Sequence, residues 1–104
     1  MILHPAPGHH LGRRPASVAS FERYVTCVRN LLRGEPASFD GRALHSGWVS
    51  TEIPILLSAG GPKILELAGR VADGVIFTGS VWPEHVAAAV ARVRDAAVSA
   101  GRQP

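Results

Sequence analysis

The chain contains 104 residues, of which 46% are hydrophobic and 18% are charged, a length and composition that suit one compact domain. It is too short to form a closed barrel of eight strand–helix units, which needs roughly 200 residues or more. Eleven Lys and Arg against eight Asp and Glu give a formal charge of +3. The arginines are scattered rather than gathered in a basic stripe, so we do not expect a nucleic-acid binder.

The single cysteine, Cys27, excludes an intramolecular disulfide, and its place in an apolar helical pattern predicts a buried, inert thiol. No stretch of the chain approaches the roughly 20 apolar residues that span a bilayer. Met1-Ile2-Leu3 is followed at once by His4-Pro5, which excludes a signal-peptide core. We therefore expect a cytoplasmic protein with no membrane partner.

Residues 1–16 are rich in His, Pro and Gly and show neither helical nor strand periodicity, so they predict an irregular leader that precedes a domain over residues 17–104. His4, His9 and His10 lie in this leader without an assembled set of metal ligands. A solvated tail is the expected role of these histidines, and no metal site is predicted.

The domain begins with an amphipathic helix, in which Ser20 is the expected cap and Gly34 with Pro36 ends the pattern. Its apolar residues recur at helical spacing: Phe21, Tyr24, Val25, Val28, Leu31 and Leu32. The following stretch, residues 37–44, is centred on Asp40-Gly41, a pair that tolerates positive φ. We predict a small surface hairpin there, followed by a loop over residues 45–52.

The next segment predicts one strand–helix–strand unit. Residues 53–59 form a short, nearly continuous apolar run, as expected for a strand of a parallel sheet. A helical apolar period starts at Pro62 and closes at Asp73-Gly74, where Asp-Gly is a turn device. Residues 75–78 form the second apolar run, and the crossover between the two runs is long enough for a parallel connection.

A final helix opens at Pro83-Glu84 and is expected to end at Gly101. Its many alanines give strong helix propensity but a shallow packing surface, so we expect it to lie against a sheet. Trp48 and Trp82 are expected to anchor loops to the core, and His85 to have an exposed or capping role.

One segment of this pattern predicts chemistry. Gly60-Gly61-Pro62-Lys63 lies between a buried strand and the first turn of a helix, where unpaired backbone N–H groups and the helix dipole favour an anion. Glycine lets a phosphate approach the backbone, Pro62 fits the first helical position, and Lys63 adds a charge. The alternative is a tight strand-to-helix turn with a solvated lysine. The residues by themselves leave both interpretations open.

The same segment resembles a signature region of the luciferase-like monooxygenase superfamily. The likeness rests on Gly-Gly-Pro-Lys at residues 60–63 followed by Leu-Ala-Gly-Arg-x-Ala-Asp-Gly at residues 67–74. It spans residues 17–104 and is nearest to the branch that uses the deazaflavin coenzyme F420. The resemblance implies an α/β fold: a fragment of a (β/α)8 TIM barrel with one parallel βαβ unit, flanking helices and a small hairpin, matching the fifth and sixth barrel strands.

In such barrels the cofactor lies at the carboxyl ends of the strands. By resemblance, the expected contacts to the cofactor and its phosphate are Ser58, Ala59, Gly60, Gly61, Lys63, Thr78 and Gly79. No catalytic acid, base or nucleophile is assigned.

The resemblance implies an oxidoreductase that passes a hydride between F420, or alternatively FMN, and a small organic substrate. The alternative function is a catalytically inactive barrel fragment that binds an anion or mediates assembly. Two isolated parallel strands expose two sheet edges, so we also expect a homo-oligomer or a complementing chain.

Overall fold

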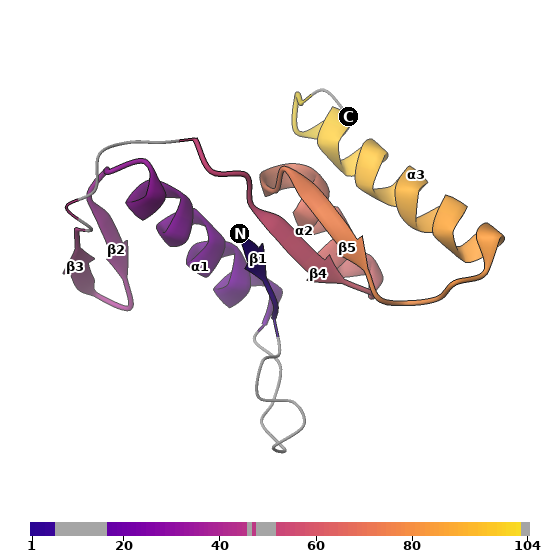
Figure 1. Ribbon diagram of the computed structural model, residues 1–104, viewed down its shortest axis with the longest axis horizontal. Coiled ribbons are helices and arrows are strands. Elements are labelled where there is room, and N and C mark those ends of the chain that lie inside the picture. The colour runs from indigo at the N-terminus through magenta and orange to yellow at the C-terminus, as the bar shows by residue number, and fades with distance from the viewer. Residues whose placement is uncertain (6–16, 46, 48–51, 103–104) are drawn as a thin grey trace, which may run out of the picture.

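The computed structural model describes residues 1–5, 17–45, 47 and 52–102, and it has the shape of a slab of 44 × 37 × 19 Å. A parallel sheet has the strand order β1-β4-β5, and a separate two-stranded sheet pairs β2 with β3. In Figure 1, α2 lies behind β4 and β5, and α3 lies to the side of β5. The elements in chain order are β1 (Ile2–Leu3), α1 (Val18–Leu32), β2 (Ala37–Phe39), β3 (Arg42–Leu44), β4 (Leu56–Ala59), α2 (Pro62–Val71), β5 (Gly74–Phe77) and α3 (Pro83–Ser99).

The first strand corrects the expectation of an irregular leader. β1 pairs in parallel with β4, with Ile2 opposite Leu56 and Leu3 opposite Leu57. Leu3 is only 7% exposed and joins the core, so burial of apolar surface holds a strand too short to show any period. The barrel fragment therefore has three parallel strands rather than two. Residues 6–16 lie outside the described part of the chain, and the domain boundary at residue 17 stays a prediction.

Helix α1 forms where its apolar period predicts it, but its cap is Ser17 and not Ser20. The Ser17 side chain accepts a hydrogen bond from the backbone N–H of Ser20, so Ser20 is the residue that is capped. The apolar face of α1 buries Phe21 and Val25 in the main core cluster. Cys27 is buried on the same helix, as predicted.

The hairpin forms as predicted. Asp40 and Gly41 have φ values of 50° and 78°, and β2 and β3 pair antiparallel on either side of them. The ring of Phe39 meets Tyr24 of α1 edge-on at a centroid separation of 6.1 Å. The hairpin thus packs on α1 and takes no part in the parallel sheet.

The predicted strand–helix–strand unit is β4, α2 and β5, with β4 confined to the last four residues of the expected run. Leu57 of β4 and Leu67 of α2 are fully buried in one core cluster. By the strand register, Leu3, Leu57 and Val75 share the face that packs on the helices. The opposite face carries Ile2 and Ile76, which are 59% and 39% exposed.

Helix α3 packs mainly against α2 and not, as expected, against the sheet. The reason is Gly69 of α2: a Cβ there would collide with the carbonyl oxygen of Val93 and lie 2.8 Å from the Cβ of Ala96. Glycine therefore lets the two helices approach closely, and the alanines of α3 suit that short separation. The helix ends as predicted at Gly101, which has a φ of 76°.

Candidate functional site

The residues predicted for cofactor binding all lie at the carboxyl ends of β4 and β5 or in the turns that follow. Ser58 and Ala59 end β4, Gly60 and Gly61 lead into α2, and Lys63 is exposed in its first turn. Thr78 and Gly79 follow β5. This is the end of a parallel sheet where open α/β folds and barrels place their ligands.

The two strand ends are in direct contact. The backbone N–H of Thr78 donates to the Ala59 carbonyl at 2.9 Å and continues the β4–β5 pairing beyond β5. A Cβ on Gly60 would lie 3.1 Å from Thr78 Oγ1, and a Cβ on Gly79 would lie 3.2 Å from the Gly60 carbonyl oxygen. The structure therefore brings Gly60, Thr78 and Gly79 together, and side chains at either glycine would crowd that junction.

Gly61 opens helix α2 as its N-cap, with φ −86° and ψ 160° and no side-chain cap. Its carbonyl oxygen accepts from the Leu65 N–H, whereas helix geometry leaves the N–H groups of Lys63 and Ile64 without an intrahelical acceptor. A Cβ on Gly61 would meet no atom of the described chain within 4 Å. An open space thus lies beside the amino end of α2, and these features fit an anionic group.

Ser58 and Ala59 differ in what they offer to a ligand. The Ala59 side chain is 2% exposed and packs with Leu65 and Ala89, and its carbonyl is held by Thr78. Ala59 therefore positions the glycines that follow it. Because neighbouring residues of a strand point to opposite faces of the sheet, Ser58 faces the side that also carries Ile76, away from the helices.

The turn between β5 and α3 adds a hydroxyl group that the sequence analysis missed. Ser80 Oγ accepts from the Trp82 N–H at 3.1 Å and lies 2.8 Å from His85 Nδ1. His85 is exposed, as predicted, and its ring contacts the Ser80 side chain rather than a backbone group of the helix. Trp82 is 63% exposed, so it does not anchor its loop to the core as expected. A serine two residues before Trp82, the N-cap of a helix without a side-chain cap, was the available signal. Trp48 lies outside the described residues.

Asp73 lies at the opposite end of β5 from the glycines and confirms the expected turn device. Its Oδ2 accepts from the Ile55 N–H at 2.8 Å and from Arg29 at 3.2 Å. Burial raises the pKa of Asp73, but the Ile55 hydrogen bond and the Arg29 and Arg102 guanidinium groups outweigh it and hold the pKa below its ordinary value. This carboxylate fastens the start of β4 to the start of β5.

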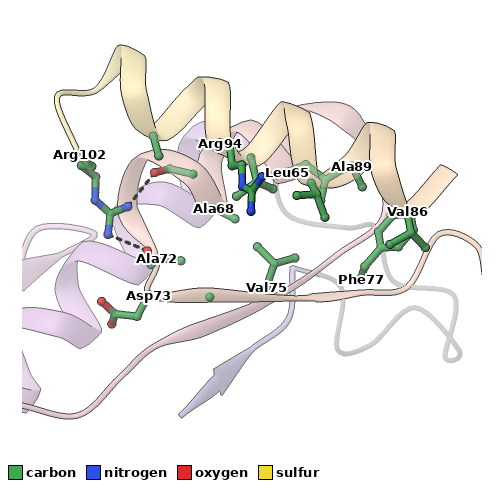
Figure 2. A pocket seen from close by; sticks show the side chains of 15 residues that line it. Leu65, Ala68, Ala72, Asp73, Val75, Phe77, Val86, Ala89, Arg94 and Arg102 are labelled. Atoms are coloured by element: carbon green, nitrogen blue, oxygen red, sulfur yellow. Dashed lines mark hydrogen bonds between the residues drawn. The ribbon is translucent and has the colours of Figure 1, made fainter. Parts of the chain in front are cut away.

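A groove of about 530 Å³ lies between α2, β5 and α3, on the helix side of the sheet. Figure 2 shows Val75, Phe77 and Val86 beside it, and Arg102 hydrogen-bonded at its end. Those bonds run from the Arg102 guanidinium to the carbonyl oxygens of Gly69 and Ala72, both at 2.7 Å. The groove is mainly apolar, which does not suit a phosphate.

Among the described residues, no helix is both long and apolar enough to cross a bilayer.

Comparison with proteins of known function or structure gives consistent results. A 5,10-methylenetetrahydromethanopterin reductase of Methanolobus tindarius is 36% identical over 85 residues, which are 77% of this chain and 26% of the reductase. An F420-dependent glucose-6-phosphate dehydrogenase of Mycolicibacterium gilvum is 30% identical over 93 residues, 83% of this chain and 28% of the dehydrogenase. The chain thus spans about a quarter of the length of these curated relatives.

The solved structure of the coenzyme F420-dependent tetrahydromethanopterin reductase from Methanopyrus kandleri superimposes with a TM-score of 0.68 at 22% identity, over 98% of this chain and 37% of that one. This likeness confirms the predicted fragment of a TIM barrel, and the share covered is close to three of eight strand–helix units. The sequence profile of the family described as "Luciferase-like monooxygenase" matches residues 6–104. The chain therefore belongs to the luciferase-like monooxygenase family.

Proposed function

We propose that this chain carries part of the cofactor phosphate site of an F420-dependent oxidoreductase, which passes a hydride between F420 and a small organic substrate in the cytoplasm. The relatives support this proposal because the glucose-6-phosphate dehydrogenases and the structurally similar reductase are described as F420-dependent enzymes. Since the chain spans only 24–28% of the first relatives, the activity belongs to a complete barrel of which this chain is a part.

The observation that carries the proposal is the open, uncapped start of α2. The N–H groups of Lys63 and Ile64 point toward the amino end of the helix, where the dipole is positive. Gly61 places no side chain in that space, and Pro62 removes an N–H that has no helical acceptor. A phosphate seated there would accept from the free amides, and the exposed Lys63 would add a charge-assisted contact.

The neighbouring residues would shape the mouth of this site. Gly60 and Gly79 keep the two turns small enough to touch, and Thr78 holds them together through its backbone. The deazaflavin supplies the hydride chemistry when bound, and the chain described here binds and orients its phosphate end. Catalytic acid–base groups are not assigned to any of these residues.

Calorimetric titration of the purified chain with F420 and, separately, with FMN tests the proposal. The informative variant is Gly61→Asp, because the new side chain enters open space at a φ that any residue adopts. Aspartate is also a favoured N-cap, so the helix keeps its stability while a negative charge occupies the phosphate position. We expect binding to weaken at least about tenfold, equivalent to ~1.4 kcal/mol.

Gly61→Ala is the matched control, because it fills the same position without charge and should retain most of the affinity. Preference for FMN over F420 would change the cofactor but keep the site. Failure of wild-type protein to bind either cofactor, with its circular dichroism spectrum showing a folded chain, would contradict the proposal and favour the inactive barrel fragment.

A further inference from the structure

The face of the parallel sheet that points away from the helices changes from apolar to polar along the strands. Figure 1 shows this face, with α2 behind it. Ile2 of β1 and Leu56 of β4 are register partners on it. Two positions further along β4, Ser58 shares the face and has Ile76 of β5 as its partner. Since helices cover the outside of a (β/α)8 barrel, this face lines the interior of the complete barrel, and its polar end is the one at which such barrels place their ligands.

His4 extends this polar end onto β1. The sequence predicts a solvated tail for this histidine, but it directly follows a strand whose Leu3 is buried against the helices. Pro5 favours extended backbone for the residue before it, so the alternation of the strand continues through His4. His4 then lies on the same face as Ile2, and the register continued by one position places it beside Ser58. An imidazole and a hydroxyl thus come from neighbouring strands at the carboxyl end of the sheet.

The Ser58 hydroxyl is short of a partner. The residue is only 9% exposed, yet its side chain makes no hydrogen bond within the described part of the chain. No fully enclosed side-chain oxygen or nitrogen of the described residues lacks a partner, so Ser58 Oγ keeps an opening on the interior face. A hydroxyl that is nine-tenths buried gains from a hydrogen bond, and a ligand on this face would supply one.

The surroundings of Ser58 indicate which part of a ligand fits. Ile76 is 39% exposed beside it, and Thr78, two positions further along β5, is exposed on the same face. Gly60, next to Thr78, places no side chain there. Among the described residues of the three parallel strands, those on this face include no Lys, Arg, Asp or Glu. An apolar surface bordered by an imidazole and hydroxyls suits an uncharged planar ring rather than a phosphate.

We propose that His4, Ser58 and Ile76 form a floor under the heterocyclic ring of the cofactor. This inference rests on the proposed function, which supplies the ring: deazaflavin and flavin both have an edge of carbonyl and N–H groups. The imidazole of His4 and the hydroxyl of Ser58 can each donate and accept a hydrogen bond, as that edge requires. The amino end of α2 takes the phosphate, so the ring and the phosphate have separate binding residues. His4 and Ser58 bind and orient the ring, and no proton transfer is assigned to them.

Nuclear magnetic resonance with two partial probes tests the proposal on the whole chain. Deazariboflavin, which has the ring but no phosphate, should shift the amide signals of His4, Ser58 and Ile76. Inorganic phosphate, which has no ring, should shift those of Lys63 and Ile64. Shifts with deazariboflavin but none with phosphate would support the floor and contradict the phosphate site, so the two proposals fail separately. Deazariboflavin that leaves the floor signals unchanged would overturn the floor, whatever phosphate does.

Paired variants separate a contact with the ring from a general effect on the fold. Ser58→Ala and His4→Ala each remove one hydrogen-bonding group and should weaken deazariboflavin binding at least about threefold, with circular dichroism and the phosphate-induced shifts unchanged. Ser38→Ala and His45→Ala make the same changes in and beside the hairpin and should leave binding unchanged. His4→Gln keeps a donor and an acceptor and should recover part of the loss. Wild-type affinity in both floor variants, or equal losses in the hairpin variants, would overturn the proposal.

Discussion

The Asp73 carboxylate accepts a hydrogen bond from the Ile55 N–H at 2.8 Å, across 18 positions of the chain. This bond joins the residue before β4 to the residue before β5 and aligns the two strands at their amino ends. Asp73→Ala removes this acceptor and leaves the N–H of Ile55, a residue that is 0% exposed, without it. We expect the free energy of unfolding to fall by about 1–3 kcal/mol, which urea denaturation measures. Asp40→Asn, which keeps a residue tolerant of positive φ at the hairpin turn, should change stability by less than about 0.5 kcal/mol.

The same carboxylate predicts a pH dependence. Because its pKa is lower in the folded chain than the ordinary value of 3.8, the stability it contributes is complete above that value and is lost as the pH falls through the folded pKa. The difference in unfolding free energy between wild type and Asp73→Asn should therefore shrink between about pH 5 and pH 2. A difference that stayed constant over that interval would show that charge on Asp73 does not matter to folding.

Gly69 predicts a steric effect between α2 and α3. Alanine there collides with the Val93 carbonyl oxygen, which is backbone and cannot rotate away. We expect Gly69→Ala to destabilise the fold by about 1–3 kcal/mol, although alanine is the better helix former. Thermal unfolding measures the melting temperatures of Gly69→Ala and of the control Gly61→Ala, whose added Cβ meets no atom within 4 Å. Equal melting temperatures for the two variants would argue against the close helix contact.

Arg102 predicts an effect at the end of α2. Its guanidinium donates to two carbonyl oxygens, those of Gly69 and Ala72, which lie in the last turn of α2 and at its C-cap. We expect Arg102→Gln to cost about 1–3 kcal/mol, because a charged donor to two part-buried acceptors is lost. Arg94→Gln also removes a positive charge but should change the unfolding midpoint little, since Arg94 is exposed.

The contact between Gly60 and Thr78 predicts non-additive behaviour. Gly60→Ala places a Cβ 3.1 Å from Thr78 Oγ1, which must then move. In a Thr78→Ala background the obstructing atom is absent, so the same alanine should cost less, by about 0.5–1 kcal/mol. Denaturation of the two single variants and the double variant gives this coupling. Additive costs would mean that the two turns do not touch.

Local chemistry explains the parts of the fold that the sequence predicts. The Asp40-Gly41 turn follows from the φ values these residues tolerate, and α2 follows from its apolar period between Gly-Gly-Pro and Asp-Gly. The position of the glycine-rich turn at a strand end follows from the same pattern.

The features that were missed depend on distant parts of the chain. β1 has only two residues, and its partner β4 begins more than 50 positions later, so no local pattern marks it. Ser17 and Ser20 are equally good caps by residue type, and only the position of the first helical turn chooses between them. Gly69 reads as an ordinary helix residue until Val93 is seen beside it.

The hairpin described above touches α1 through Tyr24 and Phe39 and shares no ladder with the parallel strands. Its tip at Asp40-Gly41 is exposed. A fluorophore or an epitope tag grafted at this tip would report on the protein without entering the glycine-rich turns that follow β4 and β5. The hairpin is therefore the natural handle for immobilising or labelling the chain in the cofactor-binding measurements.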